Sequence, residues 1–352
     1  MHRGLLTCNM LRRLSFVFAL CLLLSATACR QTTPEPTYLN GATMGTTWSV
    51  ILPSELSTPE SKSLQDKLQA RLDHINRLMS TYDPDSELSK FNDQASTDWF
   101  PLSGETLQVI LLSLEISDLS GGAFDVSVGP LVELWGFGAA PRGEHIPTDQ
   151  EVEETLSRVG YLNIEVRSNP PAVRKKVPQL KIDLSAVAKG YAVDALADIL
   201  RQNKFSDFLV EVGGELRVAG KRNKDSLWRI AIEKPLDDSR QVETVFHLSN
   251  IALATSGNYR NFYLENGQRY AHTIDPASGR PILHKLASAT VLDRSSARAD
   301  ALATALMVMG EKKARKFCEA QQIASYLLIH HNEETVSYVS PVFQRMVEKE
   351  AQ

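Results

Sequence analysis

The sequence has no excess of positive charge and lacks the commonest nucleotide- and metal-binding motifs. Lysine and arginine number 38 against 42 aspartates and glutamates in 352 residues, which gives a net charge of -4 at pH 7. A chain of this charge does not favour nucleic acid as a partner. The spacings G-x-x-x-x-G-K-[ST], G-x-G-x-x-G after a strand, H-E-x-x-H and C-x-x-C are all absent. A P-loop, a dinucleotide fingerprint and a zincin site are therefore not predicted.

The N-terminal apolar run, Leu14 to Leu24, is too short to cross a bilayer. It follows three arginines and no acidic residue, which is typical of a signal peptide. Small residues then lead to a cysteine, so we expect residues 1–28 to be a bacterial lipoprotein signal peptide. Plain secretion or an uncleaved anchor is the alternative. Without these residues the chain has 35 basic and 42 acidic side chains, a net charge of -7.

Cysteine is scarce, with four in the whole chain. Two lie inside the predicted signal, and Cys29 is expected to carry lipid on the periplasmic side of a membrane, followed by a tether over residues 29–40. Only Cys318 remains, which excludes a disulfide framework. Because Cys318 lies in a helical pattern, we expect it to be a small packing residue.

The rest of the chain changes from helical to strand-rich near residue 161. Helices are predicted after Thr58, after Ser103 and after Thr148, which opens a capping box. Strands are predicted at residues 46–52, 163–166, 180–184, 208–212, 215–218, 228–232, 242–248, 251–255, 269–274 and 289–292, and later helices at 186–202, 296–309 and 311–321, before a final hairpin. We therefore expect a mixed α/β (α+β) fold with antiparallel-rich sheets and packed helices, not a doubly wound parallel sheet.

The segment Asp183 to Tyr191 ends a predicted strand and opens a helix. A helix N-terminus offers free N–H groups, and Lys189 in its first turns can place a positive charge beside a phosphate. The alternative is that Ser185 is an N-cap and Lys189 is solvated.

Asp300 and Thr304 are four residues apart on a predicted helix, so their oxygens face the same way. Such oxygens are suitable ligands for Mg²⁺. Alanine occupies every second position from 297 to 305, which leaves room for a ligand. The alternative is an alanine-rich buried helix in which Asp300 complements the helix dipole.

The segment from Arg269 to Pro281 is predicted to be a strand that ends in a tight loop. His272 is a possible base or phosphate contact. Asp275-Pro276 and Gly279 are more easily explained as turn residues.

Taken in order along the chain, these and several shorter segments resemble the ApbE family of FAD:protein FMN transferases over about residues 40–345. The matching segments are Met44-Gly45-Thr46, Tyr82, Ala123-Phe124-Asp125, Pro130-Leu131, Trp135, 183–194, Gly213-Gly214, Ser256 to Tyr259, His272 to Pro276 with Gly279 and Pro281, and Asp300 to Thr304. The resemblance implies one ApbE-like, T-fold-like catalytic unit over residues 41–345, with residues 346–352 as a C-terminal tail.

The resemblance implies a Mg²⁺-dependent transfer of the FMN half of FAD onto a threonine hydroxyl of a partner protein, with release of AMP. The threonine would lie in a short motif of membrane-bound redox subunits. Two alternatives are an FAD pyrophosphatase, which gives FMN and AMP, and a flavin-binding lipoprotein without turnover.

Site residues follow from the same resemblance. The implied FAD contacts are Met44, Tyr82, Ala123, Phe124, Asp125, Asp183, Lys189 and His272. Tyr82 and Phe124 are expected to line an apolar slot for the flavin rings.

The implied metal site consists of the side chains of Asp300 and Thr304, the backbone carbonyl of Ala186, and position 303. Several relatives carry an acidic residue where this chain has Ala303. Lys189 and the metal held by Asp300 would neutralise the diphosphate. His272 is the leading candidate for the base, with Asp275 or Asp300 as rivals.

Overall fold

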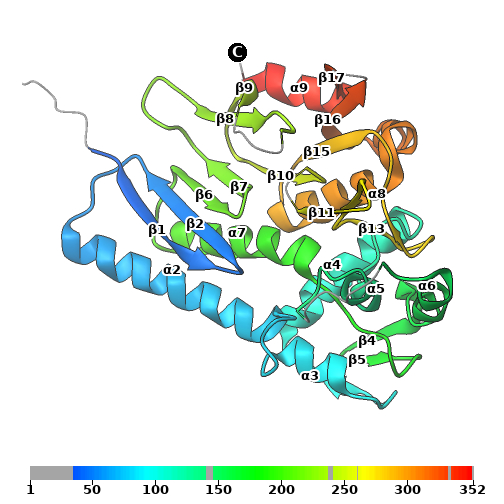
Figure 1. Ribbon diagram of the computed structural model, residues 1–352. Coiled ribbons are helices and arrows are strands. Elements are labelled where there is room, and N and C mark those ends of the chain that lie inside the picture. Colours follow the sequence, from blue (N-terminus) through cyan, green and yellow to red (C-terminus); the bar gives the residue numbers. More distant parts are fainter. Residues whose placement is uncertain (1–34, 140–145, 237–240, 260, 332–333, 351–352) are drawn as a thin grey trace, which may run out of the picture. The chain divides into compact units, whose positions relative to one another are not determined.

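An eight-stranded antiparallel sheet is the centre of the structure, a computed structural model that describes residues 35–139, 146–236, 241–259, 261–331 and 334–350 (Figure 1). The strand order is β1-β2-β6-β7-β10-β15-β16-β17, and every neighbouring pair is antiparallel. The strands are β1 (Thr37–Thr43), β2 (Thr46–Leu52), β6 (Phe208–Val212), β7 (Glu215–Ala219), β10 (Ile251–Gly257), β15 (Leu286–Asp293), β16 (Ala324–His331) and β17 (Glu334–Val339). The predicted signal peptide and Cys29 lie outside the described residues.

The sheet separates two hydrophobic cores. Successive side chains of a strand point to opposite faces, so Leu327 and Ile329 of β16 join the main core, whereas Tyr326 and Leu328 join the second. The main core is covered by α2 (Thr58–Met79), α7 (Ser185–Gln202) and α8 (Ser296–Gln321). The second is covered by β8 (Trp228–Glu233), β9 (Val242–Leu248) and α9 (Pro341–Glu350).

Shorter elements complete the fold. The chain passes through α3 (Glu87–Asp93), α4 (Gly104–Leu119), α5 (Gly129–Leu134), α6 (Asp149–Leu156) and the 3₁₀ turn η1 (Tyr161–Asn163). A three-stranded sheet contains β3 (Phe100–Pro101), β5 (Pro171–Lys175) and β4 (Ile164–Ser168), and two hairpins are formed by β11 (Phe262–Glu265) with β12 (Gln268–Ala271) and by β13 (Ile274–Asp275) with β14 (Arg280–Pro281). A third, small core is formed by residues of α5, its C-cap, α6 and β13: Leu131, Trp135, Val152 and Ile274.

The mixed α/β class and the antiparallel sheets are as predicted. The break between residues 309 and 311 is also confirmed, because Gly310 has φ 69° and ψ 171° inside α8. A Cβ at Gly310 would lie 2.8 Å from the ring of His284, so only glycine fits this break. Cys318 is buried and free, and burial raises its pKa to about 11, as expected for a packing residue.

The strand predicted near residue 183 is wrong, and so is the alternative in which Ser185 is an N-cap. Residues 180–184 do not form a strand: Lys181 makes one isolated bridge with Val128, and the backbone N–H and carbonyl of Ile182 bind the side chain of Asn92. Ser185 is not the N-cap of α7, because Leu184 occupies that position without a side-chain cap. The carboxylate of Asp183 instead accepts the Ser185 N–H at 2.8 Å.

The folded part of the chain extends beyond the expected span of 41–345 at both ends. Residues 37–40, placed in the tether, belong to β1 and pair with residues 49–52 of β2. The expected tail, 346–352, begins inside α9, where Met346 and Val347 pack on the second core. Pairing with β2 orders the N-terminal end, and packing of one apolar face of α9 on the second core orders the C-terminal end. No helix within the described residues is long and apolar enough to span a membrane.

Candidate active site

A close contact between α7 and α8 brings the two strongest predicted segments together. Gly190 makes the contact possible, because a Cβ there would lie 2.3 Å from the carbonyl oxygen of Ser296. The Gly190 N–H donates to Oδ2 of Asp300 at 3.1 Å. Lys189 and Asp300, 111 positions apart in the sequence, are therefore held in one cluster.

Glu215 is the third member of this cluster, and sequence reasoning missed it. It begins β7, is 2% exposed, and accepts from the Lys189 ammonium at 2.5 Å. The turn Gly213-Gly214 places the next residue on a strand beside α7. A single acidic residue after a glycine turn has no pattern that distinguishes it from a solvated one.

The electrostatics of the cluster follow from burial and mutual charge. Burial raises the pKa of Asp300, partly offset by Lys189. Burial also raises the pKa of Glu215 to about 7, with repulsion from Asp300 adding to it and attraction to Lys189 opposing it. For Lys189, burial works against the charge, but the attraction of Asp300 and Glu215 outweighs it and raises the pKa. Lys189 therefore remains an ammonium at neutral pH.

Lys189 lines a hollow of about 120 Å³ together with two other predicted FAD contacts, Met44 and Tyr82. Its remaining walls are Ile75, Asn76, Met79, Ser80, Thr81, Ser185 and Ala188. A cofactor-sized ligand needs a pocket of about 300–1,000 Å³. The hollow can hold one part of FAD, and the rest must lie along the adjoining surface, where Tyr82 is 65% exposed.

His272 has the geometry of a neutral base. Its Nδ1 is 3.1 Å from the carbonyl oxygen of Asn261. Because a carbonyl oxygen only accepts, Nδ1 carries the proton and Nε2 is left as the basic nitrogen. Burial lowers the pKa of His272, and the positive charge of Lys189 lowers it further. The edge of the Phe137 ring packs against the imidazole, with centroids 6.3 Å apart.

The predicted contacts at 123–125 and at Asp183 lie side by side, because the Asp183 N–H donates to the carbonyl of Val126 at 2.7 Å. Asp183 also faces Tyr82, whose pKa is raised by desolvation and by the charge of Asp183. The carboxylate of Asp125 is fully engaged with the N–H and hydroxyl of Ser127 and the N–H of Tyr161. Both oxygens of the Asp125 carboxylate therefore already have hydrogen-bond donors within the protein.

The predicted slot between Tyr82 and Phe124 is wrong. Phe124 is 2% exposed and belongs to the main core. The turn after α4 directs its ring inward, with Gly121 and Gly122 at positive φ. Tyr82 is instead exposed, and its hydroxyl donates a hydrogen bond to the carbonyl oxygen of Phe137 at 3.3 Å.

The oxygen donors expected for a metal lie at the contact of α7 and α8. Asp300 is 2% exposed, and the Thr304 hydroxyl is 3.0 Å from the Ser256 hydroxyl. Ala186 is in the first turn of α7, and Ala303 is buried with no donor atom in its side chain. Within the described residues no three His, Cys, Asp or Glu side chains gather as a metal site. One carboxylate with hydroxyl and carbonyl oxygens still fits Mg²⁺, which keeps several waters.

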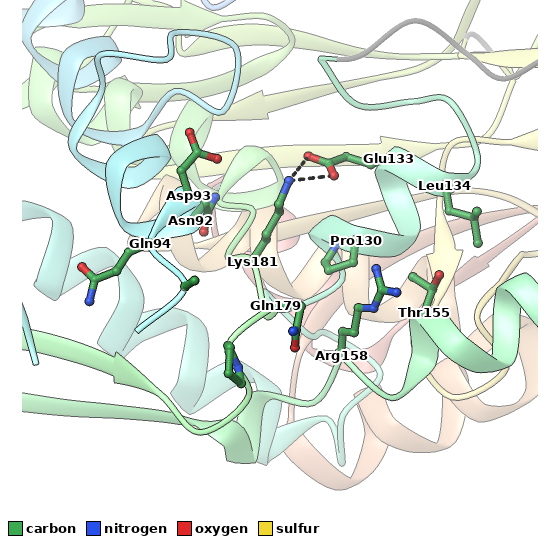
Figure 2. Close-up of a pocket in the computed structure, with 12 residues that line it drawn as sticks. Asn92, Asp93, Gln94, Pro130, Glu133, Leu134, Thr155, Arg158, Gln179 and Lys181 are labelled. Atoms are coloured by element: carbon green, nitrogen blue, oxygen red, sulfur yellow. Dashed lines mark hydrogen bonds and ion pairs between the residues drawn. The ribbon is translucent and has the colours of Figure 1, made fainter. Parts of the chain in front are cut away.

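A second hollow has a volume of about 560 Å³ and is larger than the first. Figure 2 shows residues that line it. It is bounded by residues of α3, α5 and α6 and by Pro178, Gln179 and Lys181. The Lys181 ammonium binds both oxygens of Glu133 at 2.9 Å within it (Figure 2). Its described lining includes none of the predicted FAD or metal residues, so the site is assigned to the smaller hollow beside Lys189.

Known proteins resemble the chain over almost its full described length. The sequence profile of the ApbE family matches residues 44–327. The FAD:protein FMN transferase of Vibrio cholerae is 40% identical over 335 residues, 95% of this chain and 99% of that protein. The FAD:protein FMN transferase of Escherichia coli K12 is 37% identical over 318 residues, 90% of each chain.

Solved structures of flavin transferases also resemble the chain over most of its length. The flavin transferase ApbE from Vibrio cholerae superposes with a TM-score of 0.82 at 41% identity, covering 88% of this chain and 99% of that one. The apo form of the Pseudomonas stutzeri flavinyl transferase ApbE has a TM-score of 0.82 at 32% identity, with 91% and 99% coverage.

Proposed function

The chain belongs to the ApbE family and is an FAD:protein FMN transferase, and we propose that it moves FMN from FAD onto a threonine hydroxyl in a Mg²⁺-dependent reaction. The observation that supports this proposal is that Lys189, in the wall of the hollow, interacts through its charge with both Asp300 and the neutral His272. The acceptor is proposed to be a threonine in a short motif of a membrane-bound redox subunit.

FAD is proposed to bind along the wall of the smaller hollow that α7 and the residues near it form. The ammonium of Lys189 lies at the N-terminal end of α7, where the helix dipole also favours an anion. This end of the hollow is therefore assigned to the diphosphate of FAD. Met44 and Tyr82, on the same wall, are assigned to the flavin side.

Three groups were candidates for the base, and the structure favours His272. Both carboxylate oxygens of Asp275 serve a turn, accepting from the Ala277 N–H and the Ser278 hydroxyl. Asp300 is buried between α7 and α8. His272 is half-exposed and neutral, and its basic nitrogen has no hydrogen-bond partner among the residues that the structure describes.

In the proposed step, Nε2 of His272 takes the proton from the threonine hydroxyl as its oxygen attacks the phosphorus of the FMN half. A new P–O bond joins FMN to the threonine. The bond from that phosphorus to the bridging oxygen breaks, and AMP leaves with the bridging oxygen. Lys189 stabilises the charge that develops on the diphosphate.

The residues that would hold Mg²⁺ are Asp300, Thr304 and, through its carbonyl, Ala186. When bound, the ion would neutralise diphosphate oxygens as a Lewis acid. The side chain of Ala303 contributes no ligand, so water or backbone oxygen would complete the coordination shell.

The test is to incubate the protein with FAD, Mg²⁺ and a peptide that carries the threonine motif, and to measure peptide mass and AMP. A matched peptide with valine for threonine is the control. We expect the threonine peptide alone to gain the mass of FMN less water. AMP without a modified peptide indicates an FAD pyrophosphatase, and neither product indicates a flavin-binding protein without turnover.

We also propose that a lipid on Cys29 anchors the protein on the periplasmic side of a bacterial membrane. The sequence pattern before Cys29 supports this location. Replacement of Cys29 by serine should release the protein from the membrane fraction. Unchanged membrane association of the Cys29→Ser variant would contradict the proposal.

A further inference from the structure

Glu215 has a buried position that stability alone does not explain. One carboxylate oxygen binds Lys189, but the other, Oε2, is buried and has no hydrogen-bond partner among the described residues. An unpartnered buried oxygen is unfavourable, and a buried ion pair often contributes no more stability than apolar side chains of the same volume.

The stem of Lys189 is also held in place. The turn Gly213-Gly214 passes over it, and a Cβ at Gly213 would lie 3.2 Å from Cδ of Lys189 and 2.8 Å from Cγ2 of Thr46. Gly213 has φ 63°, so the turn itself requires a residue that tolerates the left-handed region. The glycine turn thus confines the aliphatic part of Lys189. Glu215, two residues after Gly213, binds the ammonium group at its end.

A lysine needs such support because its ammonium is a point charge on a flexible four-carbon stem. Without Glu215, the charge of Asp300 would be the main attraction on the ammonium and would draw it towards the proposed metal ligands. With Glu215 in place, the Lys189 side chain is 31% exposed and lines the hollow.

We propose that Glu215 is a positioning residue for Lys189, holding its ammonium where the diphosphate of FAD binds. This inference rests on the proposed placement of that diphosphate. Glu215 acts through Lys189, so its loss should affect ligands that carry phosphate and leave the flavin ring contacts unchanged.

The test compares FAD with riboflavin, which has the same ring system and no phosphate, by titration of flavin fluorescence. Glu215→Gln removes the charge and keeps the shape of the side chain. We expect FAD binding to weaken about tenfold, riboflavin binding to stay unchanged, and Glu215→Asp to recover part of the loss. FAD binding like that of the unmodified protein, or equal loss for both ligands, would overturn the proposal.

A control for fold damage lies two residues along the same strand. Arg217 of β7 pairs with Asp194 of α7 at 2.5 Å, with both side chains mostly buried. Arg217→Gln should lower the melting temperature about as much as Glu215→Gln, with no change in the ratio of FAD to riboflavin affinity. If Glu215→Gln does not fold, the same ratio measured on Glu215→Asp decides the question: an unchanged ratio refutes the proposal.

Lys189→Met separates this inference from the function it rests on. If Lys189 meets the diphosphate, this variant loses affinity for FAD and not for riboflavin. Equal loss of both ligands in Lys189→Met would refute the placement of the diphosphate. Selective loss in Lys189→Met with no loss in Glu215→Gln would refute the role of Glu215 alone.

Discussion

Replacing Gly190 by alanine should separate α7 from α8 and disable the site without removing any proposed ligand. A Cβ at this position would lie 2.3 Å from the Ser296 carbonyl oxygen, 2.6 Å from its carbon and 2.7 Å from Cα of Ala297. All three atoms are backbone, so no side-chain rotation can relieve the overlap. Restoring an ordinary contact requires the helices to move apart by about 1 Å.

Such overpacking costs about 1–3 kcal/mol and lowers the melting temperature by roughly 2–6 °C. The same movement draws Asp300 away from the Gly190 N–H and from Lys189. A misplacement of this size lowers the rate of a positioned reaction about 100-fold. Thermal unfolding and AMP release should both be measured, the second well below the melting temperature.

Gly104→Ala is the matched control, because a Cβ there meets nothing within 4 Å and the residue begins a helix. It should be neutral or slightly stabilising, with unchanged turnover. If Gly190→Ala melted and turned over like Gly104→Ala, the helix contact would not be what assembles the site.

Three further changes test single residues. Asp300→Asn should reduce AMP release by about 100-fold or more and spare most FAD binding, measured by chromatography and flavin fluorescence; near-normal turnover would exclude Asp300 as a metal ligand. The pKa of His272 is lowered from 6.5 by burial, so kcat should fall only below that pH. His272→Gln should abolish this fall of kcat at low pH and should lower kcat about 10²–10⁴-fold. If the fall at low pH persisted in the variant, His272 would be excluded as the base. Burial lowers the pKa of Lys175 from 10.5 to about 8, so the unfolded chain binds more protons between these values. The unfolding free energy should therefore rise by about 1–3 kcal/mol across pH 8–10.5 relative to Lys175→Met, and a constant difference would contradict this.

The parts of the fold that sequence predicts well are those specified by local signals. The break at Gly310 and the capping box of α6, in which Thr148 and Glu151 bind each other, are local in this sense. The wrong strand at 180–184 shows the limit, because its backbone bonds go to the side chain of Asn92 and to the carbonyl of Val126. No pattern within the segment reveals such partners.

The site residues likewise fall into those that the sequence could predict and those that it could not. Lys189, Asp300 and His272 stand in segments with recognisable order, and the structure places them around one cluster. Glu215 could not be singled out, because its importance comes from a contact with a residue 26 positions earlier. The resemblance implied that Phe124 contacts the flavin, whereas the glycine turn before it directs the ring into the core.

The central claim is that the phosphoryl group passes to a threonine and not to water. The most direct measurement counts AMP and flavin-modified peptide in the same reaction over time, with FAD, Mg²⁺ and the threonine peptide present. We expect one AMP for each modified peptide throughout. AMP that accumulates while the peptide stays unmodified would contradict it.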